Sequence, residues 1–113
     1  MSKSKYDKVT PKKERLGFFD KIAKRLVLRR FDKAIRKAYK EKRLVFGDNL
    51  VTYKGESGEQ FIGSADYISR LIFNINVFKN ESNAQAIFWA KITSEDVRVI
   101  IEKIGNKNKK DGG

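Results

Sequence analysis

The spacing of apolar residues changes abruptly at Arg43, and this change limits the chain to a fold that mixes helix with strand. Before Arg43, apolar residues recur every three or four positions, as on one side of an α-helix. They form two stripes whose directions differ by roughly a quarter turn of the helix. We therefore expect a bend, or two short helices that meet near Leu26 to Arg29. The two stripes are Leu16, Phe19, Ile22, Ala23 and Leu26, and then Val27, Phe31, Ala34, Ile35 and Ala38.

Short apolar segments separated by turn residues follow Arg43. Residues 44–46 and 50–53 predict two strands around a turn at residues 47–49, because Gly and Asn accept the positive φ that such a turn requires. A second turn at residues 55–58 leads to a brief strand at residues 60–62. Ser64 then predicts the N-cap of a short helix over residues 65–71, although a strand that starts at Tyr67 fits the same residues.

A hairpin is expected next. Phe73, Ile75 and Val77 alternate with asparagines, which is the period-two pattern of a half-buried strand. After a polar loop at residues 80–83, residues 85–92 return as its partner strand. On that strand Phe88 and Trp89 would point to opposite faces, with Trp89 on the wetter one.

The last part of the chain predicts a helix. Thr93 supplies a hydroxyl N-cap, and the acids that follow it meet the positive end of the helix dipole. Gly105 predicts the position where this helix ends. Its apolar face comprises Val97, Ile100, Ile101 and Ile104.

These elements together predict a small α+β fold. It has a basic amphipathic N-terminal helix, a mainly antiparallel sheet of four or five short strands, and a C-terminal helix packed on the sheet. Residues 1–15 are expected to be a disordered basic lead, residues 16–105 a single domain, and residues 106–113 a disordered polar tail.

The excess positive charge lies entirely in the first third of the chain. Residues 1–43 contain 17 Lys and Arg against 5 Asp and Glu, whereas residues 44–113 contain 9 of each. Such an asymmetry indicates a polyanionic partner. The expected nucleic-acid-binding residues are the cations of the N-terminal helix: Lys21, Lys24, Arg25, Arg29, Arg30, Lys33, Arg36, Lys37 and Lys40.

Residue types that are missing exclude several kinds of chemistry. The chain has neither Cys nor His, which excludes disulfides, the usual zinc sites and imidazole-based catalysis. The acids at Asp48, Glu56, Glu59 and Asp66 match no metal-nuclease spacing, and no glycine-rich nucleotide-binding motif occurs. We therefore expect no enzyme activity, no cofactor and no metal. The charged start lacks the apolar core of a signal peptide, and the longest apolar run of about five residues is too short to span a bilayer, so we expect a cytoplasmic protein.

The favoured function is therefore non-catalytic binding of nucleic acid, as in a regulator or accessory factor of a plasmid or virus. Lys outnumbers Arg 18 to 8, which favours recognition of backbone and shape over base reading. The same helix could instead bind an anionic membrane surface or an acidic protein. The sequence leaves open whether the nucleic acid is DNA or RNA, and whether it is single- or double-stranded.

Overall fold

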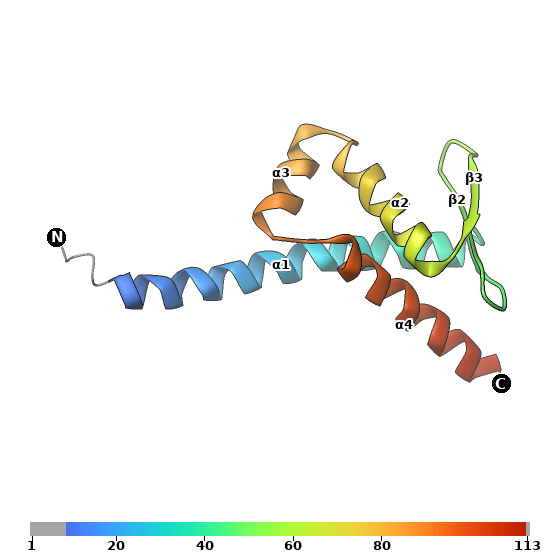
Figure 1. The fold of residues 1–113 in the computed structure, drawn as a ribbon, viewed down its shortest axis with the longest axis horizontal. Helices are drawn as coiled ribbons and strands as arrows, with labels where there is room; N and C mark the ends of the chain where they lie inside the picture. The colour runs from blue at the N-terminus through green and yellow to red at the C-terminus, as the bar shows by residue number, and fades with distance from the viewer. Residues whose placement is uncertain (1–8, 113) are drawn as a thin grey trace.

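The structure, a computed structural model, describes residues 9–112 and the side chains of residues 20–107. Residues 9–112 form four helices and one three-stranded antiparallel sheet, so the fold is α+β (Figure 1). The elements in chain order are α1 (Val9–Lys40), β1 (Leu44–Phe46), β2 (Val51–Lys54), β3 (Gln60–Gly63), α2 (Ala65–Val77), α3 (Glu81–Trp89) and α4 (Ser94–Gly112).

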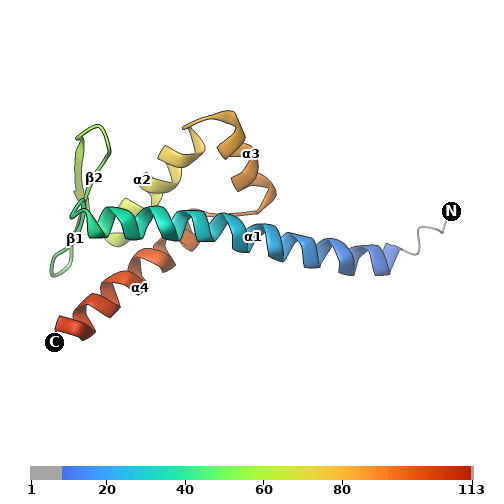
Figure 2. The same ribbon diagram turned by 180° about the vertical axis from the view of Figure 1, so that it is seen from behind.

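Helix α1 runs without interruption through Leu26 to Arg29, so the expectation of two short helices that meet there is wrong. The two apolar stripes have different surroundings. Ile22 and Leu26 of the first stripe are 37% and 52% exposed. A straight helix therefore suffices, because the second stripe supplies the buried residues of α1 within residues 20–40. The N-terminal half of α1 instead extends beyond the other elements (Figures 1 and 2). The buried members of the second stripe are Val27, Phe31, Ile35 and Ala38.

The start of α1 also differs from the expected disordered lead. Residues 9–15 already belong to the helix, whereas residues 1–8 lie outside the described part of the chain. With 32 residues and a rise of about 1.5 Å per residue, α1 is about 48 Å long. It therefore accounts for most of the 58 Å length of the protein.

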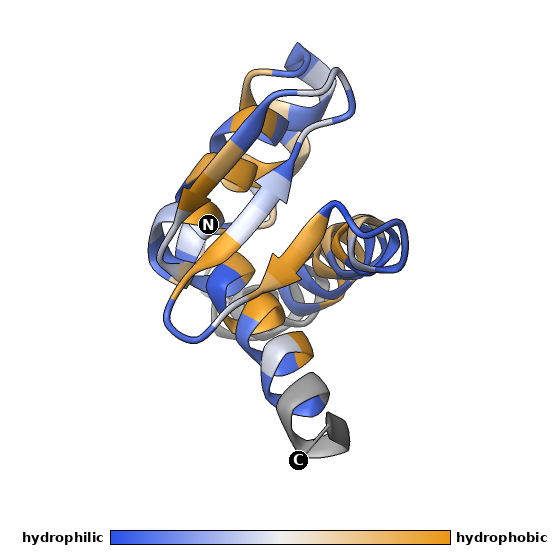
Figure 3. Cartoon of the chain, turned by 90° about the vertical axis from the view of Figure 1, so that its right-hand side faces the viewer, coloured by the Kyte–Doolittle hydropathy of each residue, from blue (hydrophilic) through white to orange (hydrophobic). Residues whose placement is uncertain are grey.

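The sheet contains the three strands predicted between residues 44 and 62. β2 is central and pairs antiparallel with β1 and β3, so that Tyr53 lies opposite Leu44 on one side and Phe61 on the other. In Figure 3 the turns that join the strands are hydrophilic, and the hydrophobic residues lie on the strands and helices. The sheet is smaller than the predicted four or five strands because the remaining apolar segments are helical.

The predicted hairpin at residues 73–92 is wrong, because residues 73–77 belong to α2 and residues 81–89 form α3. Ser64 caps α2, its Oγ accepting a hydrogen bond from the Tyr67 N–H at 3.1 Å, and the helix continues to Val77. The alternating residues are compatible with this helix. Phe73 and Val77, four positions apart, are half-buried, whereas Ile75 between them is 42% exposed.

Helix α3 also has a local start signal. The Asn80 side chain accepts a hydrogen bond from the Asn83 N–H at 2.8 Å, which satisfies one free donor of the first turn. Ile87 faces the core, and the next two residues, Phe88 and Trp89, are both exposed, at 76% and 69%. The expected alternation of these two aromatic residues across a strand is therefore wrong.

Helix α4 begins where the sequence predicts, since the Asp96 carboxylate accepts a hydrogen bond from the Thr93 N–H at 3.0 Å. It does not end at Gly105 but continues through residues 106–112, the predicted tail. A Cβ atom at position 105 would lie 2.8 Å from the Phe46 ring, so the glycine allows close packing there. Apart from this contact with β1, α4 packs mainly on α2 and α1 and not on the sheet.

We expect Ile68→Ala to lower the free energy of unfolding by about 2–5 kcal/mol, because the Ile68 side chain is fully buried in the core. Ile75→Ala is the matched control on the same helix. Ile75 is 42% exposed, so its truncation should cost less than about 1 kcal/mol. Urea unfolding measures both values. Equal losses would contradict the place of Ile68 in the core.

Candidate nucleic-acid interface

The side of α1 that faces away from the core carries seven of the nine predicted cations. Burial of Val27, Phe31 and Ile35 against the other helices turns the opposite side of α1 toward solvent. All seven cations on that side are exposed. We name them the basic face: Lys21, Arg25, Arg29, Lys33, Arg36, Lys37 and Lys40.

The spacing of the basic face follows from helix geometry. Lys21, Arg25, Arg29, Lys33 and Lys37 occur every fourth residue, which places successive Cα atoms about 6 Å apart along the helix axis. The row covers about 24 Å. Because these residues share one continuous helix, the relative positions of their Cα atoms are set before any partner binds.

Two members of the basic face are paired with acids of α1 or of the residue that follows it. Arg36 lies 2.6 Å from the Asp32 carboxylate, and the Lys37 ammonium lies 3.9 Å from Glu41. Both pairs are largely exposed and contribute little to stability. In contrast, five cations of the basic face make no ion pair with the residues whose side chains are described: Lys21, Arg25, Arg29, Lys33 and Lys40.

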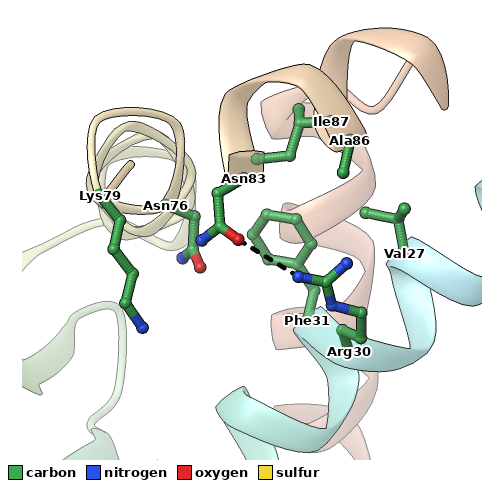
Figure 4. Close-up of a pocket in the computed structure, with 8 residues that line it drawn as sticks. All are labelled: Val27, Arg30, Phe31, Asn76, Lys79, Asn83, Ala86 and Ile87. Carbon is green, nitrogen blue, oxygen red and sulfur yellow. Dashed lines mark hydrogen bonds between the residues drawn. The ribbon is translucent and has the colours of Figure 1, made fainter. Parts of the chain in front are cut away.

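The structure turns the other two predicted cations away from the basic face. Lys24 points to α4, where its ammonium lies 3.7 Å from Asp96. Arg30 points to α3 and donates a hydrogen bond to the Asn83 side chain at 3.2 Å (Figure 4). There it lines a pocket of about 200 Å³ whose walls include Val27 and Phe31.

A cleft of about 370 Å³ separates α1 from α4 and contains a cation that sequence reasoning missed. Lys103 of α4 lies across the cleft from the basic face. Its position depends on α4 packing beside α1, whereas the sequence predicted that α4 covers the sheet. We name this space the α1–α4 cleft; its lining residues are Arg25, Leu28, Arg29, Asp32, Arg36, Asp96, Val99, Ile100 and Lys103.

A larger groove, of about 540 Å³, lies between the sheet and helices α1 and α2. Its charged lining is balanced, with two cations, Arg43 and Lys79, and two acids, Glu56 and Glu59. Arg43 is also engaged within the protein. It donates hydrogen bonds to the Glu41 carboxylate at 2.8 Å and to the Lys54 carbonyl at 3.0 Å, and the bond to Glu41 raises the pKa of its guanidinium. This groove is therefore a weaker site for a polyanion than the basic face.

The described residues contain no group of three acidic side chains that could hold a metal ion. No helix within residues 9–112 is long and apolar enough to cross a lipid bilayer. No protein-family model, curated protein or solved structure matches the chain.

Proposed function

We propose that this protein binds nucleic acid without catalysis and that the basic face contacts the phosphate backbone. The carrying observation is that five exposed cations on one continuous helix lack an acidic partner among the described side chains. Such cations bind phosphates with release of condensed counterions. An acidic protein would need a matching row of carboxylates, whereas every nucleic acid carries a phosphate at each nucleotide.

The composition of the basic face favours recognition of backbone and shape. Four of its seven residues are lysines, which act as point charges and lack the planar donor fork with which arginine reads guanine. Binding should therefore depend weakly on base sequence and strongly on salt. We expect a micromolar or tighter dissociation constant, with log K falling against log salt at a slope of about −4 or steeper.

We expect the combined change of Arg25, Arg29 and Lys33 to Gln to weaken binding and to flatten this slope by about 2 to 3, because three phosphate contacts are lost. Lys54, Arg70 and Lys79 changed to Gln make a control with the same net charge, since all three are exposed and lie outside α1. Fluorescence anisotropy at several salt concentrations measures the slopes. Equal slopes in the two variants would exclude the basic face as the contact surface.

The Asp32→Asn variant should bind nucleic acid more tightly, by roughly two- to fivefold, because it removes an acid and releases Arg36 from its ion pair. Asp66→Asn is the matched control, since Asp66 pairs with Arg70 of α2 at the same four-residue spacing and at 2.9 Å. The control should leave the affinity unchanged. Weaker binding by Asp32→Asn would argue against a phosphate contact at Arg36.

A membrane surface is the second candidate, because Ile22 and Leu26 are exposed on the same helix as the basic face. A helix with exposed apolar and basic residues is typical of binding to anionic lipid. In that case Ile22→Ser with Leu26→Ser should abolish co-sedimentation with phosphatidylserine vesicles. The control changes Val45 and Ile62, which are exposed on the sheet, to Ser. Absence of wild-type co-sedimentation would exclude this candidate.

A further inference from the structure

We infer that the α1–α4 cleft binds one sugar-phosphate strand of a double-stranded nucleic acid. Arg25 and Arg29 would contact the strand from α1, and Lys103 from α4. This inference rests on the proposed function and adds two statements to it: a second helix takes part, and the ligand is a duplex.

The cleft has two walls of regular structure. Helices α1 and α4 lie close together where α4 begins, and there Lys24 contacts Asp96 at 3.7 Å. From that point the two helices diverge toward their C-terminal ends, as both views show (Figures 1 and 2). Between them Leu28, Val99 and Ile100 contribute apolar lining, and Val99 is 44% exposed. A sugar-phosphate strand can place its sugars on such a surface and its phosphates against the cations at the walls.

The acids of the cleft do not cancel its positive charge. Asp32 is paired with Arg36, and Asp96 with Lys24. Asp96 also accepts the hydrogen bond from the Thr93 N–H that caps α4. Three cations that line the cleft make no ion pair with the described side chains: Arg25, Arg29 and Lys103.

The surroundings of the cleft favour a duplex over a single strand. Proteins that bind single strands without sequence preference combine a basic groove with aromatic side chains on which unpaired bases stack. No aromatic residue within residues 20–107 lines the cleft. The most exposed aromatic residues lie elsewhere: Phe78 follows α2, and Phe88 and Trp89 belong to α3, on the opposite side of α1 from α4 (Figure 1). A row of cations fixed on helices matches a backbone whose phosphates already have regular positions.

The test compares wild-type protein with Lys103→Gln by fluorescence anisotropy at several salt concentrations. The ligands are duplex DNA, duplex RNA and single-stranded DNA of the same length. Wild type should bind at least one duplex more tightly than the single strand. Lys103→Gln should weaken duplex binding and flatten the salt slope by about 1, as expected for one lost phosphate contact. Lys54→Gln is the matched control, because Lys54 is exposed, belongs to β2 and does not line the cleft; it should bind as wild type does.

Two results would overturn the inference and leave the proposed function intact. One is duplex binding that depends on Arg25 and Arg29 but is the same in Lys103→Gln and wild type. The other is single-strand binding as tight as binding to both duplexes. A protein that binds none of the three ligands would overturn the proposed function itself. Circular dichroism of Lys103→Gln should match wild type, because the side chain is exposed.

Discussion

Burial of one apolar stripe of α1 determines how the charges of that helix are presented. Because Phe31 and Ile35 are 5% and 3% exposed, the rotation of α1 about its own axis is set by hydrophobic packing. The cations on the opposite side must then face solvent, since burying an unpaired ammonium or guanidinium would cost far more than it gains. The basic face is thus a consequence of core packing, and the two cations on its flanks, Lys24 and Arg30, contact α4 and α3 instead.

Continuity of α1 links this core to the part of the helix that projects from it. The C-terminal half of α1 packs on the core, which sets the direction of the helix axis. Because the helix is continuous, its projecting N-terminal half follows the same direction. Ile22 and Leu26, which lie before the buried stripe of α1, stay exposed at 37% and 52%. Such a helix holds its charges at constant spacing, which lowers the ordering cost of binding a regular polyanion.

The apolar pattern predicted secondary structure well where local geometry and packing agreed, and failed where they conflicted. Turn residues occur in both segments that connect the three strands predicted between residues 44 and 62, and the structure contains all three strands. Phe73, Ile75 and Val77 alternate as in a strand, but Phe73 and Val77 are also four residues apart, as on one side of a helix. The apolar pattern alone therefore does not distinguish a strand from a helix at these residues. The caps at Ser64 and Asn80 favour helices, and burial of Ile68 and Ile72 against α4 completes α2.

The sequence by itself determined the charge asymmetry, the helical spacing before Arg43 and the side of α1 on which most cations lie, because these follow from residue order and helix periodicity. Only the tertiary structure decided that α4 packs beside α1. That packing places Lys103 opposite Arg25 and Arg29, creates the cleft and pairs Lys24 with Asp96. The physical reason is that contacts between residues more than 70 positions apart depend on how whole apolar faces fit together, which no local pattern records.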